Sequence, residues 1–317
     1  MNISIVIPNY NGATIMKENL PLVLEAVRDY KDGTIEIIIA DDPSTDNSNE
    51  VINKFINSIN VNHVIGKTIE NKNRHESGFS KNVNRGTSLA TGDILILLNT
   101  DVVPHINFLQ PLLAHFADDT VFAVGCMDES VEAGEIVQRG RGIGSWKRGF
   151  LMHQRGALDK TNTLWVSGGS SAFRKSIWDK LHGLDPLFNP FYWEDIDLSY
   201  RALKSGYKIY FEKKSVVVHE HDKGSIKTAF KSDHIKTIAY RNQFLFVWKN
   251  ITDSKMIFNH LFWLPYHFLN ALKGRDSAFI RGFGKALLMI PQIMESRRRL
   301  QKLFTLSDAQ LLKEFTK

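Results

Sequence analysis

The stretch "ISIVIPNYNG", Ile3 to Gly12, begins as a continuous apolar run and ends abruptly in polar and turn-forming residues. Two runs of the same kind follow, "IEIIIAD" from Ile35 to Asp41 and "DILILLN" from Asp93 to Asn99. Runs that are apolar on both faces are typical of central strands in a parallel sheet covered by helices. Apolar residues with helical spacing lie between them, around residues 14–30, 46–58 and 79–90. This alternation predicts a doubly wound α/β sheet.

The composition is that of a globular protein. A chain of 317 residues can bury the core of one large domain, or of a domain with an appendage. Cys126 is the single cysteine, so no internal disulfide can form and a reducing compartment fits. The N-terminus "MNISIVIP" lacks the basic region and cleavage site of a secretory signal, and we expect it to form the first strand.

The net charge of +6 is concentrated near the C-terminus. From Lys273 to Lys317, ten Lys and Arg residues outnumber four Asp and Glu residues, so this segment carries the whole excess. The remaining 272 residues are neutral, which argues against a nucleic-acid-binding core. We therefore expect no nucleic-acid partner and a basic C-terminal region directed at an anionic surface.

Polar residues follow each predicted strand: "PNYNG" after the first, "DDPSTD" after the second and "NTD" after the third. Ligands of such sheets bind beyond the carboxyl ends of the strands. The first of these turns lacks the GxGxxG spacing of a dinucleotide site, and the chain has no phosphate-binding loop ending in Gly-Lys-Ser/Thr. The interpretation that remains is a nucleotide bound by the polar residues at the ends of the strands.

The stretch "FYWEDIDLSYRALKSG", Phe191 to Gly206, gathers three carboxylates behind three aromatic residues. Acidic residues are favoured in the first turn of a helix, and Asp197 has Arg201 four positions later. We therefore interpret Asp197 as structural and expect Glu194 and Asp195 to face a cleft. Further strands are predicted at "YKIYF" and "SVVVHEHD", whereas the Gly- and Arg-rich segment from Gln138 to Phe150 is expected to be irregular.

Four blocks resemble the family 2 inverting glycosyltransferases with a GT-A fold, particularly rhamnosyltransferase- and galactofuranosyltransferase-like enzymes that extend polysaccharides and lipid-linked glycans. The blocks are "SIVIPNYNG", "IIIADDPSTDNS", "GFSKNVNRGTSLATGDILILLNTD" and "VSGGSSAFRKSIWDKLHGLDPLFNPFYWEDIDLSYRALKSGYKIYF". Their order and spacing carry the resemblance, which extends from Ile3 to about His221. It implies a mixed doubly wound sheet, a catalytic domain over residues 1–222 and a helical C-terminal region over 223–317. Residues 1–101 would bind the nucleotide sugar and 102–222 the acceptor.

The resemblance implies a nucleotide-diphosphate sugar, UDP- or dTDP-linked, as donor. Asp41 would contact the base, although Ser44 and Asp46 in the same stretch are interpreted as turn and helix-capping residues. Val83 stands where relatives often have Arg, which implies a weaker contact on that side. The candidate donor-binding residues are Pro8, Asn9, Tyr10, Asp41, Gly78, Phe79, Asn84, Asn99 and Thr100.

The resemblance also implies a divalent metal, Mg²⁺ or Mn²⁺, beside the diphosphate. "NTD" occupies the family's DxD position, with Asn99 in place of the first acid and Asp101 as the retained metal ligand. His219 matches a further ligand of some relatives, and a structural role for it is left open; His221 is a weaker candidate. Phosphate oxygens and water can complete the coordination of such an ion.

Asp195 matches the family's catalytic base, which would deprotonate an acceptor hydroxyl during a single inverting displacement. Glu194 would orient the acceptor or raise the basicity of Asp195. Tyr192 and Trp193 would offer flat faces to a sugar ring. Gly168 and Gly169 would let the backbone approach the acceptor, a glycan or polyprenyl-linked glycan, closely.

The C-terminal region permits two interpretations. Met256 to Gly274 is apolar and aromatic but interrupted by Asn, His and Pro, so we do not predict a membrane-spanning helix. Basic amphipathic helices can lie on an anionic membrane, which would place the protein peripherally on the cytoplasmic face of the cell membrane. The alternative is a helical subdomain that packs on the catalytic domain or on a second subunit.

Two other functions are left open beside the transferase. A metal-dependent phosphoesterase could use Asp101, Asp195, His219 and His221, but it would need more clustered ligands than the sequence clearly supplies. A non-catalytic glycan-binding or assembly subunit is conceivable because Asn99 replaces an acid.

Overall fold

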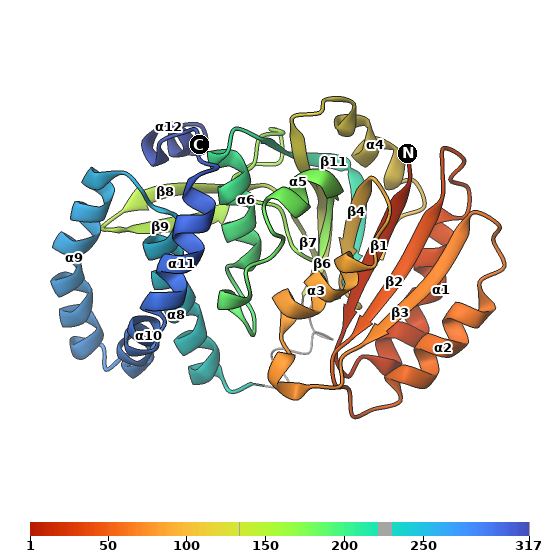
Figure 1. The fold of residues 1–317 in the computed structure, drawn as a ribbon, viewed down its shortest axis with the longest axis horizontal. Coiled ribbons are helices and arrows are strands. Elements are labelled where there is room, and N and C mark those ends of the chain that lie inside the picture. The colour runs from red at the N-terminus through yellow and green to blue at the C-terminus, as the bar shows by residue number, and fades with distance from the viewer. Residues whose placement is uncertain (133, 221–229, 317) are drawn as a thin grey trace.

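A computed structural model describes residues 1–132, 134–220 and 230–316. Within these residues a mixed sheet of nine strands runs through the molecule in the order β3-β2-β1-β4-β10-β6-β11-β5, with β7 paired to β6 (Figure 1). The strands from β3 to β4 are parallel, whereas β10 is antiparallel to both of its neighbours. The predicted doubly wound, mixed α/β sheet is confirmed.

The predicted strands and helices of the first half are present. Asn9 at the end of β1 lies beside Asp41 at the end of β2 in the parallel register. The strands are β1 (Ile3–Asn9), β2 (Ile35–Asp41), β3 (Val64–Glu70), β4 (Ile94–Leu98), β5 (Val102–Pro104), β6 (Val121–Glu132), β7 (Glu135–Arg139), β8 (Gly142–Lys147), β9 (Phe150–Arg155), β10 (Ser170–Arg174) and β11 (Lys208–His219).

Helices cover both faces of the sheet (Figure 1). They are α1 (Ala13–Val27), α2 (Ser48–Ser58), α3 (Phe79–Ser88), α4 (Leu109–Ala114), α5 (Lys175–Lys180), α6 (Glu194–Lys204), α8 (Ser232–Asn250), α9 (Ser254–Lys273), α10 (Ser277–Leu288), α11 (Ile290–Gln301) and α12 (Asp308–Lys313). Short 3-10 turns lie at Arg74–Glu76, His115–Ala117 and Pro186–Phe188.

Side chains of the central strands alternate between two cores. In β4, Ile94, Ile96 and Leu98 join the core under α1 and α2. Leu95 and Leu97 join the core that contains α3, α6 and the C-terminal helices. This alternation explains why the strand is apolar at every position, because both of its faces are buried.

The C-terminal helices belong to the second of these cores. Phe244, Ile293 and Leu311 are buried in the same cluster as Trp178 and Leu198, which precede residue 222. The C-terminal helices therefore pack on the preceding part of the chain, as one of the two interpretations of this region expected. The boundary that we placed between residues 222 and 223 lies outside the described residues.

The prediction of an irregular segment from Gln138 to Phe150 is wrong, because the chain forms β7 and the β8–β9 hairpin there. Glycine serves close packing in this segment: a Cβ on Gly142 would lie 2.4 Å from the ring of Trp165. Gly149 turns the hairpin with a φ of 82°. The glycines that indicated irregularity instead permit a tight turn and close contact.

Candidate active site

Asn9 and Asp41 meet at the carboxyl ends of β1 and β2. The Asn9 side-chain amide donates to Asp41 over 2.6 Å and to Ser48 over 3.0 Å, and Ser44 donates to Asp41 over 2.7 Å. Burial raises the pKa of Asp41 above its ordinary value. Asp46 accepts from the backbone N–H groups of Ala13 and Ser48, which agrees with its interpretation as a turn residue.

The remaining residues of this strand edge differ in exposure. Pro8 is half-buried, and Tyr10 beside it is 47% exposed, so its ring is open to solvent. The backbone carbonyl of Thr100 accepts from the Asn19 side chain over 2.9 Å. The Asn9–Asp41 pair and the exposed Tyr10 therefore belong to the same end of the sheet.

The loop of Gly78 and Phe79 is held between two parts of the chain. The Gly78 N–H donates to Asp42 over 2.8 Å, and the Phe79 N–H donates to the carbonyl of Pro190 over 3.1 Å. A Cβ on Gly78 would lie 2.6 Å from the Asn189 side chain. The φ of Gly78, 121°, also favours glycine at this position. This loop therefore connects the end of β2 to the segment that precedes α6. Asp42, which the sequence analysis did not select, anchors it.

Asn84 lies apart from the strand ends. Its side chain donates to the carbonyl of Leu184 over 2.7 Å and accepts from the N–H of the same residue over 3.0 Å. Both polar atoms of the Asn84 amide are thus used within the protein, where they fix α3 against the segment after α5.

Gly168 and Gly169 lie between the "NTD" segment and Asp195. The Asn99 N–H donates to the carbonyl of Gly169 over 2.9 Å, and a Cβ on Gly169 would lie 2.3 Å from the Asn99 amide nitrogen. A Cβ on Gly168 would lie 3.3 Å from the Phe79 ring and 3.7 Å from the Cβ of Asp195. The structure therefore brings Phe79, Asn99 and Asp195 together around these two glycines.

Asp101 and His219 form the predicted metal-ligand pair. His219 Nε2 lies 3.4 Å from an Asp101 carboxylate oxygen, and their side chains are 10% and 13% exposed. Two ligand atoms on neighbouring positions of an octahedral ion lie about 3 Å apart, so this pair can share one cation. Within the described residues no group of three or more His, Cys, Asp and Glu could hold a metal. A bound ion would take most of its ligands from phosphate and water.

Asp128 on β6 is the site residue that the sequence analysis missed. Its carboxylate lies 2.8 Å from His219 Nδ1, on the far side of the ring from Asp101. Burial opposes the charged form of His219, but the hydrogen bonds with Asp101 and Asp128 outweigh it and raise the His219 pKa to about 9. The sequence offers little signal for Asp128, because the pairing joins residues 91 positions apart.

Asp195 and Glu194 begin α6, after two residues in the left-handed region. Tyr192 and Trp193 have φ values of 72° and 75°. The buried side chain of Asn242 on α8 donates to the carbonyls of Phe188, Phe191 and Tyr192 over 2.8–2.9 Å. This C-terminal helix therefore fixes the conformation that presents the two acids.

The environment of the acid pair raises both pKa values. Burial raises the pKa of Asp195 to about 6. Backbone hydrogen bonds to its carboxylate, including one from Ile196 N–H over 2.7 Å, favour the ionised form and limit this rise. Burial and the Asp195 charge raise the pKa of Glu194 well above its ordinary value. One oxygen of Glu194 has no hydrogen-bond partner among the described residues. Such a pair is typical of groups that exchange a proton near neutral pH.

Asp197 is structural, as the sequence predicts. It is fully buried and pairs with Arg201 and Lys249, each over 2.8 Å. The expectation that both aromatic rings face a sugar needs correction. Trp193 is 7% exposed and packs edge-on against His153 and beside Phe246, whereas Tyr192 is 39% exposed. Only Tyr192 of this pair presents an open ring.

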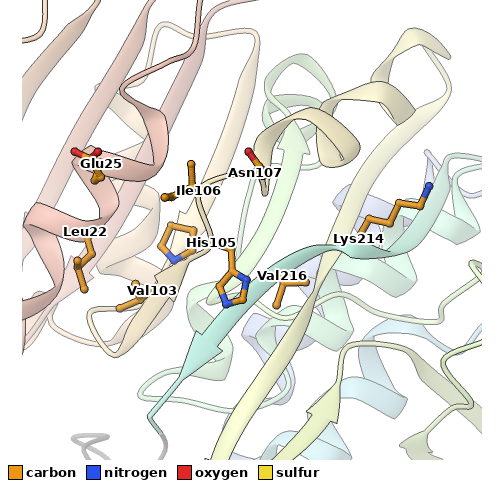
Figure 2. A pocket seen from close by; sticks show the side chains of 9 residues that line it. Leu22, Glu25, Val103, His105, Ile106, Asn107, Lys214 and Val216 are labelled. Atoms are coloured by element: carbon orange, nitrogen blue, oxygen red, sulfur yellow. The ribbon is translucent and has the colours of Figure 1, made fainter.

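A surface groove of about 480 Å³ lies apart from these residues (Figure 2). It contains none of the predicted site residues and is bordered by α1, the segment after β5 and the edge of β11. Its lining consists of Leu22, Glu25, Val103, Pro104, His105, Ile106, Asn107, Lys214 and Val216. The predicted site residues therefore lie outside this groove.

Two further predictions meet the described residues. No helix in them is long and apolar enough to cross a membrane, as we expected for Met256 to Gly274. His221, the weaker metal candidate, lies outside the part of the chain that the structure describes.

Comparison with solved structures shows the fold. A crystal structure of GalNAc-T7 with UDP, GalNAc and Mn²⁺ superposes with a TM-score of 0.71 at 18% identity, covering 99% of this chain and 56% of that one. TarS 1–349 of S. aureus in complex with UDP-GlcNAc gives a TM-score of 0.60 at 13% identity, covering 99% and 91%. Both are glycosyltransferases with the GT-A fold, which this chain shares.

Curated relatives match parts of the chain. The pre-mycofactocin glycosyltransferase of Mycobacterium tuberculosis is 29% identical over 150 residues, which are 46% of this chain and 31% of that protein. The O-antigen chain rhamnosyltransferase RfbN of Salmonella typhimurium is 21% identical over 226 residues, or 70% and 67%. The chain thus matches about a third of the mycobacterial relative. Residues 4–181 match the model of glycosyl transferase family 2, more than half of the chain, and the protein belongs to that family.

Proposed function

We propose that this protein is an inverting glycosyltransferase. It moves a sugar from a UDP- or dTDP-linked donor to a hydroxyl group of a glycan or polyprenyl-linked glycan. Family membership favours a transferase over the phosphoesterase and over the non-catalytic subunit. The rhamnosyltransferase and other glycosyltransferase relatives support an acceptor of this kind.

The observation that carries the proposal is the shared edge around Gly168 and Gly169. Asn99, two residues before Asp101, contacts Gly169, and Asp195 lies against Gly168. The metal-ligand segment and the proposed base therefore flank the same pair of glycines. A donor diphosphate beside Asp101 and an acceptor hydroxyl beside Asp195 would meet above them.

Asp195 acts as the general base. With a pKa of about 6, its carboxylate is mostly ionised at neutral pH yet more basic than an exposed aspartate. As the acceptor oxygen forms its bond to the anomeric carbon, Asp195 takes the hydroxyl proton. The bond between that carbon and the diphosphate oxygen breaks, and its electron pair leaves with the nucleotide. One displacement inverts the configuration at the anomeric carbon.

Glu194 assists through its charge and position. Its buried carboxyl lies next to Asp195 in the chain and raises the cost of a second negative charge. Burial and the Asp195 charge raise the pKa of Glu194, and one of its carboxylate oxygens has no hydrogen-bond partner among the described residues. Glu194 can therefore hydrogen-bond and orient the acceptor beside Asp195.

Asp101 and His219 hold the divalent metal when it is bound, and that ion supplies Lewis-acid stabilisation to the leaving diphosphate. Asp128 fixes the ring of His219 so that Nε2 faces Asp101. At the nucleoside end, Asn9, Tyr10 and Asp41 form the seat for the base. The Mn²⁺ present in the GalNAc-T7 structure supports the proposal that a divalent metal is used.

We also place the protein peripherally on the cytoplasmic face of the cell membrane, where a polyprenyl-linked acceptor would be presented. The buried free thiol of Cys126 fits a reducing compartment. The basic C-terminal region supports contact with anionic lipid.

A panel of nucleotide sugars tests the proposed function. Each donor is added with and without Mn²⁺, and thermal stabilisation and slow donor hydrolysis are measured, because a bound ligand raises the melting temperature. We expect one UDP- or dTDP-sugar to stabilise the protein in a metal-dependent manner. Asp195→Asn should preserve this binding and lose the turnover. If no nucleotide sugar binds, the proposal fails.

A further inference from the structure

Three polar side chains of α9 face the protein. Trp146 donates to Asn259 over 3.0 Å, His260 lies 2.7 Å from the carbonyl of Gly149, and His267 lies 2.8 Å from the carbonyl of Arg148. These three residues thus contact the β8–β9 hairpin. The Asn and His residues that interrupt the apolar pattern in the sequence therefore fix the helix to the protein.

The opposite face of α9 is apolar and open to solvent. Phe258, Phe262 and Leu272 are 70%, 65% and 66% exposed, and Leu261 and Leu269 are 58% and 57% exposed. With the exposed Pro265 these residues recur at three- and four-residue intervals, so they lie on one side of the helix. We call this set, Phe258, Leu261, Phe262, Pro265, Leu269 and Leu272, the α9 outer face.

Helix α9 lies at one end of the molecule, opposite α1 and α2 (Figure 1). Met256, Phe268 and Ala271 on the inner side of α9 pack in or against the core, so this helix is apolar on its outer side as well, whereas an ordinary surface helix has one apolar side. A continuous exposed apolar stripe of this kind marks a surface that meets a partner.

Basic side chains lie close to this stripe in the chain. Lys255 and Lys273 lie exposed near the two ends of α9, and Arg275 and Lys285 follow on the connecting turn and on α10. Arg281 on α10 pairs with Asp233. Asp276 is the single acid between residues 254 and 294. Its carboxylate accepts from Tyr240 over 2.7 Å and from the Phe279 N–H, so it is engaged in capping α10.

We propose that the α9 outer face docks on an anionic lipid bilayer. Its Phe and Leu side chains enter the interface between headgroups and acyl chains, while the flanking Lys and Arg side chains contact lipid phosphates. The proposal rests on the proposed function in one respect: the polyprenyl-linked acceptor explains why the protein would be at a membrane. The occupant is lipid rather than a second copy of the chain, because two such faces would bring like charges together.

Sedimentation with vesicles tests the docking. The full chain is mixed with vesicles of phosphatidylglycerol and phosphatidylcholine, or of phosphatidylcholine alone. We expect the wild type to bind the anionic vesicles more strongly. The double variant Phe258→Ser, Phe262→Ser should bind them about tenfold or more weakly, since it removes two large apolar groups from the lipid.

The control variant carries Ile106→Ser and Ile136→Ser, whose side chains are 64% and 66% exposed outside α9. It should bind vesicles like the wild type. Wild-type protein that stays in solution with anionic vesicles overturns the proposal. So does a Phe258→Ser, Phe262→Ser variant that binds them normally, or a wild-type dimer that this variant dissociates.

Metal-dependent donor stabilisation is measured on the same preparations, because it requires no membrane. If the donor binds and the vesicles do not, the docking proposal and the proposed membrane location fail, while the proposed sugar transfer stands. If the vesicles bind and no donor does, the proposed function alone fails. The two outcomes are therefore distinguishable.

Discussion

The carboxylate of Asp128 lies 2.8 Å from His219 Nδ1, while Nε2 of the same ring lies 3.4 Å from Asp101. One imidazole thus joins a carboxylate on β6 to the segment after β4. Such a partner behind a metal-ligating histidine fixes the tautomer and the ring orientation. Asp128 is therefore a positioning residue in the proposed metal site.

Asp128→Asn should lower the affinity for Mn²⁺ about 10- to 100-fold, because the amide no longer accepts the Nδ1–H bond with full strength. Calorimetric titration of the metal with the nucleotide diphosphate measures this directly. The neighbouring Glu129→Gln is the control, since Glu129 contacts Gln138 instead. Equal Mn²⁺ affinity in both variants would remove Asp128 from the site.

Asp195→Asn should lower kcat about 10²- to 10⁴-fold, the usual contribution of a general base. Donor binding, measured by thermal stabilisation, should remain because the proposed donor seat is at Asn9 and Asp41 and not at Asp195. Asp197→Asn serves as a contrast: it removes a charge that pairs with Arg201 and Lys249, so it should destabilise the fold. Full turnover by Asp195→Asn contradicts the mechanism.

The rate should depend on pH through the same group. Because the base must be ionised and its pKa is about 6, kcat/KM should rise about tenfold per pH unit below that value and level off above it. The folded-state pKa is raised above the ordinary 3.8, so the stability contributed by protonated Asp195 is lost as pH rises through about 6. Asp195→Asn should therefore melt higher than the wild type above pH 6 and similarly below pH 4. An unchanged difference across this range would refute the shift.

Lys204 on α6 and Asp308 on α12 form an ion pair of 2.6 Å with no exposed surface. Lys204→Met should lower the free energy of unfolding by about 3–5 kcal/mol, because it leaves the Asp308 charge buried without its partner. Lys208→Met is the control: its 2.8 Å pair with Asp118 is about half exposed and screened by solvent, so its loss should change the stability little. Denaturant titration compares them. Equal losses would show that α12 is not part of the same cooperative core.

Gly169→Ala should weaken or abolish turnover, since the new methyl would overlap the Asn99 side chain and displace the "NTD" segment. Gly284→Ala is the matched control, because a Cβ there meets nothing within 4 Å. It should leave turnover intact and favour the helix by about 0.5–1 kcal/mol. Turnover and melting temperature separate the two effects. Normal turnover of Gly169→Ala would argue against the role of this contact.

Local patterns in the sequence determined the α/β class, the strands β1, β2 and β4 and the helices between them. They also separated structural Asp197 from the neighbouring acids, because a helix brings residues four positions apart together. The motif order named Asp101, Asp195 and His219. The first two inferences depend on periodicity and on spacing within one element, which the sequence states directly, whereas the three site candidates depend on the resemblance of the motifs to a known family.

Tertiary structure alone decided the contacts between distant segments. It paired Asp128 with His219, used Asn84 to fix α3, buried Trp193 in the core and turned the polar side of α9 inward. It also converted the Gly-rich segment after Gln138 into a hairpin. These outcomes depend on which surfaces meet across many intervening residues. Local propensity carries no information on that choice, because the free energy of packing is set by both surfaces together.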